Sequence, residues 1–166
     1  MRIRNSIAIY LCLLSLTASA QYTLQGNAVA LDDNCYQLTD ALPTQVGAVW
    51  YDEPINLEQS FDLQFKMNFG DNQGNGSSAN PGGDGMMFVM QTIGPSAIGE
   101  LGQGMGFQGL LPSLGIEFDT YLNTDVDDIT FDHIGIISDG DVDHTAPTAI
   151  AGPVTATSLG ADIEDG

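Results

Sequence analysis

The sequence feature that most constrains the fold is the recurrence of short segments of strand character between glycine-rich connections. The clearest segment, residues 60–69, alternates apolar and polar side chains over nine residues. This period is expected of a strand with one buried and one solvated face. Shorter apolar runs occupy residues 46–50, 86–90, 114–118 and 133–137, and helical periodicity is almost absent. The pattern therefore predicts an all-β chain, an antiparallel sandwich or jelly roll.

Two connections are long and rich in turn-forming residues. Residues 70–83 exceed the usual length of a loop in a compact domain, which favours a functional or mobile segment. Residues 94–109 carry six glycines. Residues 139–166 give only weak strand signals and contain no recognisable terminal element.

The first twenty residues have the features of an export signal. Arg2 and Arg4 precede an apolar run at residues 7–16, and small residues at 18–20 offer a cleavage site. The run is too short to span a bilayer, and no later segment is apolar for long enough to do so. We therefore expect a signal peptide at residues 1–20 and a single exported domain at residues 21–166, secreted or held at the cell surface.

The charge balance limits the class of partner. The chain has 22 Asp and Glu against three Lys and Arg, and removal of the signal peptide leaves Lys66 as the single basic side chain. Nucleic acid and anionic membrane surfaces both require a basic footprint, so neither is expected as a partner. Cys35 is the one thiol of the mature chain, which excludes an intrachain disulfide and predicts a buried structural cysteine.

Two carboxylates lie on an otherwise apolar segment. If residues 114–118 continue as a strand, Glu117, Asp119 and Tyr121 project from one face while Ile116 and Phe118 point into the core. Neighbouring carboxylates on such a strand repel each other and resist desolvation. A bound cation is the simplest source of neutralising charge.

Further potential ligands follow in the next loop and strand. Asn123 and Asp128 supply oxygen atoms, and His133 supplies an imidazole nitrogen. Oxygen ligands select Ca²⁺, whereas carboxylates with one imidazole suit Mn²⁺ or a similar transition ion. The spacing fails the EF-hand pattern, which requires Gly where Asp128 stands. For Asp125 and Asp127 we favour an ordinary solvated turn.

This stretch resembles the signature of the legume-type (L-type) lectins, and in particular their bacterial secreted members. The signature runs through Glu117, Asp119, Tyr121, Asn123, Asp128 and His133 without a gap. Residues 83–88 resemble the family's second motif, in which Asp84 precedes an apolar strand, and residues 102–107 resemble its glycine-rich loop. The resemblance implies a concanavalin-like antiparallel sandwich. Because domains of this family are longer, it also implies a sandwich that is incomplete at its C-terminus.

The resemblance also assigns roles to individual residues. Asp119 and Asp128 would bridge two ions, with Asn123 and the Tyr121 carbonyl completing the Ca²⁺ site, and Glu117 and His133 the transition-metal site. The sugar would be held by Asp84, by Asn123, by the Tyr121 ring and by a backbone N–H of Gly102 or Gly104. The peptide bond before Asp84 would be cis. The partners implied are glycans, and the chain could carry further domains.

Two other functions compete with carbohydrate binding. A jelly-roll glycoside hydrolase would carry a second acid at position 121 or 122, where this chain has Tyr121 and Leu122. Catalysis is therefore not expected. The second alternative is a structural or adhesive module of a larger surface protein, which calcium would stiffen and which would bind no sugar.

Overall fold

The computed structural model of the chain describes residues 22–70, 83–130, 132–159 and 163. The predicted signal peptide and most of the predicted loop at residues 70–83 lie outside this set. Within it, no helix is long and apolar enough to cross a membrane.

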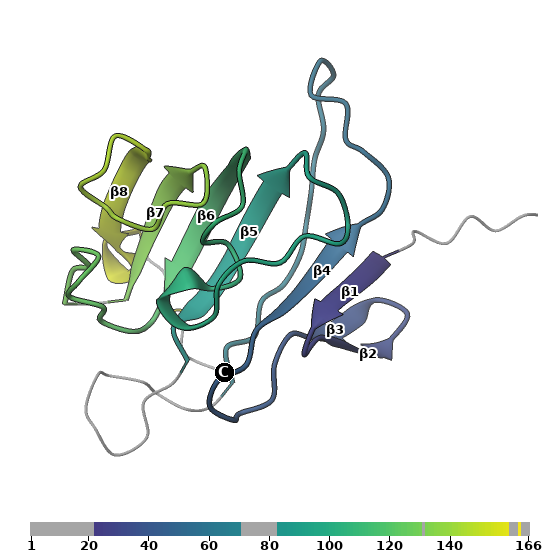
Figure 1. Cartoon of the computed structure of the whole chain (residues 1–166), viewed down its shortest axis with the longest axis horizontal. Coiled ribbons are helices and arrows are strands. Elements are labelled where there is room, and N and C mark those ends of the chain that lie inside the picture. The colour runs from purple at the N-terminus through teal and green to yellow at the C-terminus, as the bar shows by residue number, and fades with distance from the viewer. Residues whose placement is uncertain (1–21, 71–82, 131, 160–162, 164–166) are drawn as a thin grey trace, which may run out of the picture.

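The N-terminal third forms two small antiparallel pairs (Figure 1). Strand β1 (Tyr22–Gly26) pairs with β4 (Gly47–Tyr51), and β2 (Val29–Asp32) pairs with β3 (Cys35–Gln37). The second pair is a hairpin whose β2 strand is exposed along its whole length. Cys35, at the start of β3, is exposed as well, so the prediction of a buried cysteine is wrong. Of the three residues of β3, Tyr36 and Gln37 are partly covered, whereas Cys35 stands at the exposed start of the strand.

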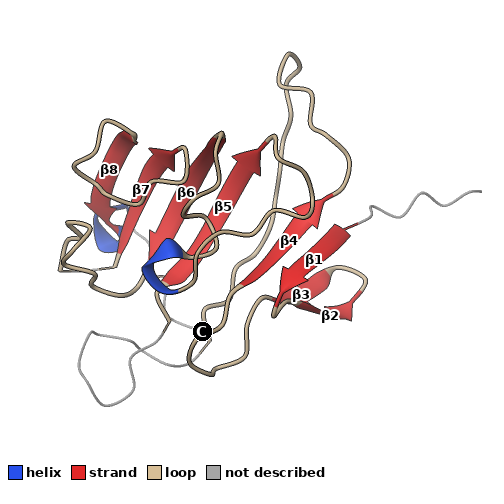
Figure 2. Cartoon of the chain, viewed as in Figure 1, coloured by secondary structure: helices blue, strands red, loops and turns tan. Residues whose placement is uncertain are grey.

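The remaining strands form one four-stranded antiparallel sheet in the order β5-β6-β7-β8. Its strands are β5 (Gly85–Gln91), β6 (Ser113–Asp119), β7 (His133–Ser138) and β8 (Ala149–Thr155). Two single 3₁₀ turns, η1 (Gly102–Gly104) and η2 (Ala156–Leu159), are the helical segments of the described residues, which contain no α-helix (Figure 2). The predicted all-β, antiparallel class is confirmed.

Four of the five predicted strands are present, and one is not. The runs at residues 46–50, 86–90, 114–118 and 133–137 correspond to β4, β5, β6 and β7. Residues 60–69, which have the clearest alternation, form no strand. A strand requires a neighbour to take its backbone hydrogen bonds, and no described strand pairs with this segment. Its apolar side chains remain largely exposed, although the Phe65 ring stacks on Phe88 of β5 at 5.4 Å.

The connection between β5 and β6 folds over one face of the large sheet and builds the core there. Phe107, from this connection, is fully buried and packs in a cluster with Val126, Ile137 and Val142. Three of these four residues therefore come from connections rather than from strands. The same connection contacts the β1–β4 pair, because the indole N–H of Trp50 donates to the Ala97 carbonyl at 2.7 Å.

The covered face of the sheet carries the acids, which reverses part of the expectation. Along β6 the buried positions are Gly115, Glu117 and Asp119, while Ile116 and Phe118 on the other face are only half-buried. The alternation was predicted correctly, but the side that is covered was not. The side of the sheet that carries the two carboxylates is buried because the β5–β6, β6–β7 and β7–β8 connections all contribute residues to it.

Candidate functional site

The site begins at the ends of two paired strands. In the β6–β7 ladder Asp119 lies opposite His133, and Glu117 lies opposite Gly135. Glu117 and His133 are each 1% exposed and Asp119 is 3% exposed. The ladder register therefore places two acids and one imidazole on the same covered face, within two residues of each other along the strands.

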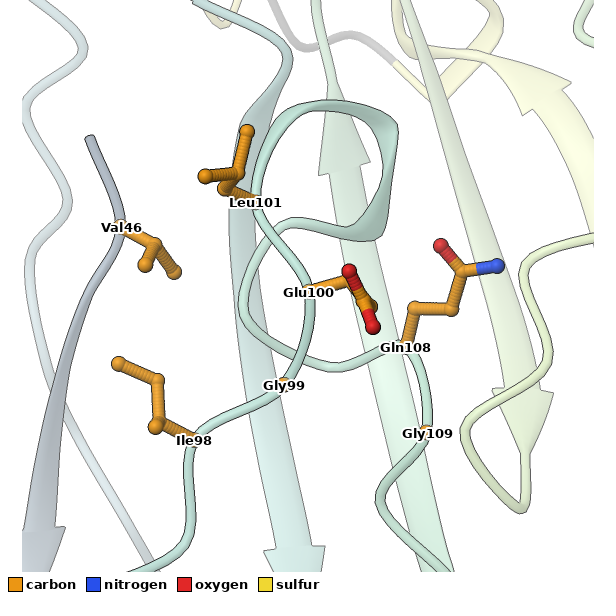
Figure 3. Close-up of a pocket in the computed structure, with 7 residues that line it drawn as sticks. All are labelled: Val46, Ile98, Gly99, Glu100, Leu101, Gln108 and Gly109. Atoms are coloured by element: carbon orange, nitrogen blue, oxygen red, sulfur yellow. The ribbon is translucent and has the colours of Figure 1, made fainter. Parts of the chain in front are cut away.

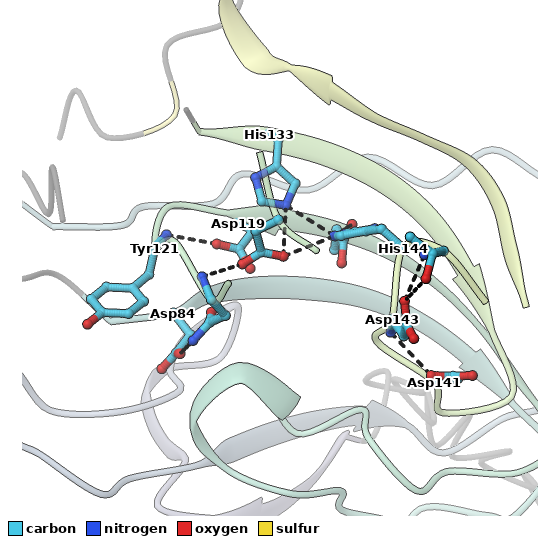
Figure 4. Close-up of polar contacts among 11 residues, drawn as sticks. Asp84, Asp119, Tyr121, His133, Asp141, Asp143 and His144 are labelled. Carbon is cyan, nitrogen blue, oxygen red and sulfur yellow. Dashed lines mark hydrogen bonds and ion pairs between the residues drawn. The ribbon is translucent and has the colours of Figure 1, made fainter. Parts of the chain in front are cut away.

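The loop after β6 turns back toward this cluster. The Tyr121 N–H donates to Asp119 Oδ1 at 2.7 Å, and the Asn123 N–H donates to Asp128 Oδ2 at 2.6 Å (Figure 4). These bonds close the loop and direct Asp128 inward. As a result, ligand atoms of Asp119, Asp128 and His133 all lie within 4.8 Å of one another. The neighbouring Asp127 is exposed and takes no part in this cluster.

A second histidine, which the sequence motifs did not indicate, completes the cluster. His144 comes from the β7–β8 connection, and its side chain is 3% exposed. Its Nε2 lies 3.2 Å from Glu117 Oε1, 3.2 Å from Asp128 Oδ1 and 3.3 Å from His133 Nε2. Ligand atoms of Glu117, His133 and His144 also all lie within 4.8 Å of one another. The resemblance signature ends at His133 and gave no reason to search further along the chain.

Burial strongly disfavours the charged forms of the two strand acids. Desolvation raises the pKa of Glu117 to about 7, with the charge of Asp128 adding to the effect and that of His144 opposing it. Desolvation likewise raises the pKa of Asp119 to about 8, although its bond from the Tyr121 N–H opposes the rise. Burial alone would lower the pKa of His144, but the Asp128 and Glu117 carboxylates outweigh it and raise this pKa. A divalent cation would supply the positive charge that stabilises the ionised forms of these buried acids.

The predicted sugar-binding acid lies beside the predicted calcium ligand. The Asn123 side-chain amide donates to Asp84 Oδ1 at 3.4 Å, across 39 residues of sequence. The Asp84 carbonyl accepts from the Thr120 N–H at 3.0 Å, which attaches the start of β5 to the end of β6. Desolvation raises the pKa of Asp84, and its bond from Asn123 opposes the rise. In Figure 4, Asp84 and the Tyr121 ring lie on the opposite side of Asp119 from His144.

The peptide bond before Asp84 differs from what the family resemblance implied. Among the described residues, the cis peptide bonds precede Pro112 and Pro153, so the prediction of a cis bond before Asp84 is wrong.

Gly102 and Gly104 form the 3₁₀ turn η1, and a Cβ atom on Gly85 would lie 3.0 Å from Met105 Sδ, just after this turn. The glycine-rich loop therefore reaches the residue that follows Asp84.

A pocket of about 380 Å³ lies on another part of the same loop (Figure 3). It is lined by one residue before β4 and six residues of the β5–β6 connection: Val46, Ile98, Gly99, Glu100, Leu101, Gln108 and Gly109. None of the predicted site residues lines it, so the candidate site is the cluster around Asp84, Asn123 and the metal ligands.

Comparison with known proteins identifies the family. The family model for the legume lectin beta-barrel domain matches residues 15–166. The chain belongs to this family. The chain is also 32% identical over 128 residues to a putative L-type lectin-domain containing receptor kinase I.10 of Arabidopsis thaliana. The match covers 68% of the chain but 19% of that protein, so the chain spans about a fifth of the relative's length.

Membership of the legume lectin family agrees with the observed architecture and indicates carbohydrate binding. The antiparallel sheets and the absence of an α-helix among the described residues fit the β-sandwich of this family. The acidic and histidine groups provide candidate positions for metal ions. The kinase named in the relative's description is a property of that much longer protein, and it is not carried over to this chain.

Proposed function

We propose that this chain is an exported carbohydrate-binding domain whose sugar site is ordered by Ca²⁺ and a transition-metal ion. Asp84, Asn123, Tyr121 and a backbone N–H of Gly102 or Gly104 bind the sugar. Asp119, Asn123, Asp128 and the Tyr121 carbonyl hold Ca²⁺, while Glu117, Asp119, Asp128 and His133 hold the second ion. The protein binds glycans without modifying them, outside the cell or at its surface.

The observation that carries this proposal is the position of Asn123 between the two sets of residues. Its backbone N–H bonds Asp128, a metal ligand, at 2.6 Å, and its side-chain amide bonds Asp84, the sugar ligand, at 3.4 Å. Its Oδ1 atom is buried and has no hydrogen-bond partner among the described residues. A buried amide oxygen without a partner is costly. Coordination of Ca²⁺, which takes amide and carboxylate oxygens, would satisfy it.

Sugar binding needs this order because each hydroxyl contributes little by itself. A hydrogen bond contributes about 0.5–1.5 kcal/mol net, and about 1.5–3 kcal/mol when one group is charged. Useful affinity therefore requires a carboxylate and an amide that are already fixed in position. Metal ions that fix residues 119–128 would hold Asn123 against Asp84 before the sugar arrives.

The test is binding to a glycan array with and without EDTA. The metal-loaded protein should bind a defined set of glycans, lose them in EDTA and leave the glycans intact. Asn123→Ala should abolish binding, whereas Thr124→Ala, the exposed neighbour in the same loop, should not. Metal binding without any glycan binding would instead identify a structural or adhesive module, and cleavage of the glycan would identify a hydrolase.

A further inference from the structure

We propose that His144 is a direct ligand of the second ion, and that Glu117, Asp128, His133 and His144 together form a four-coordinate site selective for Zn²⁺ over Mn²⁺. This inference rests on the proposed metal-ordered function and names the ion at one of its two sites. It adds His144 to the predicted ligand set of this ion, leaves Asp119 to the Ca²⁺ site and changes the expected metal.

The three separations from His144 Nε2 to the other proposed ligand atoms fit a small tetrahedral ion. His144 Nε2 lies 3.3 Å from His133 Nε2, 3.2 Å from Glu117 Oε1 and 3.2 Å from Asp128 Oδ1, and the His133–Asp128 separation is 3.7 Å. Ligands about 2.0–2.1 Å from a tetrahedral zinc ion are about 3.3–3.4 Å from one another. Neighbouring ligands of a six-coordinate ion with bonds of about 2.1 Å are closer, at about 3.0 Å.

Hydrogen bonding alone does not account for the convergence on His144. Its Nε2 atom can carry one proton, yet it faces a carboxylate oxygen of Glu117, a carboxylate oxygen of Asp128 and the ring nitrogen of His133, all at 3.2–3.3 Å. One proton cannot be directed at all three. The Glu117 Oε1 atom is buried and accepts no hydrogen bond of ordinary geometry among the described residues. An ion between the four atoms would use a lone pair from each of them.

The donor set also decides which ion is favoured. Two carboxylates neutralise a divalent cation, and two imidazoles suit zinc, whereas carboxylate, carbonyl and water ligands suit manganese and calcium. The Asp84–Asn123 side of the site offers mainly oxygen atoms. The two sides of the Asp119–Asp128 pair therefore differ in chemistry, with oxygen ligands for Ca²⁺ on one and mixed nitrogen and oxygen ligands for Zn²⁺ on the other.

The chain holds His144 in place independently of any ion. Its backbone N–H donates to the Val126 carbonyl at 3.2 Å, which attaches the β7–β8 connection to the loop that carries Asp128. Val142, two residues earlier, is 3% exposed in the core. A ligand that is buried and anchored at the backbone is preorganised for binding.

The experiment titrates the full chain, freed of metal by EDTA and dialysis, with Co²⁺, Zn²⁺ and Mn²⁺. Four-coordinate Co²⁺ gives an intense visible spectrum and six-coordinate Co²⁺ a weak one, so Co²⁺ reports the geometry directly. We expect the intense spectrum, its displacement by stoichiometric Zn²⁺ and little displacement by Mn²⁺. In His144→Gln, zinc affinity should fall by at least about 100-fold, beyond the 10–100-fold typical of a residue that only supports a ligand. Mn²⁺ affinity should change much less.

Two further variants keep the result interpretable. Asp127→Asn removes an exposed acid beside Asp128, at a backbone φ of 62° that Asn tolerates, and it should bind zinc as the parent does. His144→Cys keeps a zinc ligand, so it should retain zinc and add a cobalt–thiolate absorption band that is absent from the parent. A folded His144→Gln protein with parental zinc affinity, or a weak cobalt spectrum in the parent, would overturn the inference.

The outcome also separates this inference from the proposed function. If Mn²⁺ binds as tightly as Zn²⁺ while glycan binding still requires metal, only the inference about His144 fails. If no divalent ion binds at all, the metal-ordered sugar site fails with it.

Discussion

Gly135 of β7 lies directly opposite Glu117 of β6, and a methyl group added to Gly135 would overlap Glu117 Oε1. The glycine therefore provides the space into which the Glu117 carboxylate extends. At 1% exposure, Glu117 has no solvent region into which it could move. The shape of the metal site is thus set partly by a residue that carries no side chain.

Replacing this glycine should damage metal binding more than folding. Gly135→Ala should displace the Glu117 carboxylate and weaken transition-metal affinity by at least about tenfold, which is the effect expected when a residue that positions a metal ligand is changed. Isothermal titration of the metal-free protein measures the change. Gly83→Ala is the matched control, because a Cβ atom there meets nothing within 4 Å. Unchanged metal affinity in Gly135→Ala would show that Glu117 is not a ligand.

The metal-free protein should lose stability as pH rises. The folded state raises the pKa of Glu117 from 4.5 to about 7 and that of Asp119 from 3.8 to about 8. At these two acids the folded chain therefore binds more protons than the unfolded chain between about pH 4 and pH 8, and the stabilisation that they contribute is lost as pH rises through the folded values. Thermal melts in EDTA should show a lower midpoint at pH 8.5 than at pH 5. With excess metal the trend should reverse, because binding requires deprotonated ligands.

The control for this trend must account for the high net negative charge of the chain. A Glu117→Gln, Asp119→Asn double variant should flatten the dependence on pH. Asp125→Asn, Asp127→Asn removes the same charge from exposed positions and should preserve the slope. Equal slopes in the two double variants would mean that general charge repulsion, and not burial of the two acids, causes the loss.

Asp84→Asn should weaken glycan binding without removing the metal. The substitution replaces an acceptor oxygen with a donor and removes the charge, and charge-assisted hydrogen bonds contribute about 1.5–3 kcal/mol. We expect a tenfold to hundredfold loss of glycan affinity, measured by titration on the same preparation as calcium affinity, which should change little. Parental glycan binding by the Asn variant would reduce Asp84 to a turn residue.

Phe107→Ala should be the most destabilising single change in the β5–β6 connection. The side chain is fully buried and packs against Val126, Ile137 and Val142. Large-to-small changes of a buried Phe cost about 3–5 kcal/mol. Urea unfolding of the metal-loaded protein measures the loss, and Leu111→Ala, at an exposed position of the same connection, should cost little.

The sequence predicted best what depends on local geometry. Alternation along a strand is fixed by the backbone, so the two-residue spacing of Glu117 and Asp119 was enough to assign both to one face. The same reasoning could not identify which face is covered, because that depends on where the connections run. His144 was missed for a similar reason: its place in the cluster depends on the bond from its N–H to the Val126 carbonyl, 18 residues earlier in the chain.

At residues 60–69 the sequence predicted a strand that the structure does not contain. Their alternation is as regular as any in the chain, yet periodicity describes only one strand and says nothing of its neighbour. The adjacency of Asp84 and Asn123, across 39 residues, could be predicted only through the family resemblance. Local pattern carries no information on long-range contacts of this kind.

The core and the metal ligands occupy the same two connections. Val126 is two residues from Asp128, Val142 is two residues from His144, and both valines pack on Phe107. An ion that fixes Asp128 and His144 would therefore also reduce the opening fluctuations of the apolar cluster between them. Amide hydrogen exchange at Phe107, whose N–H bonds the Gly104 carbonyl at 2.7 Å, should slow when metal binds. An amide that touches no ligand would then report occupancy of the site.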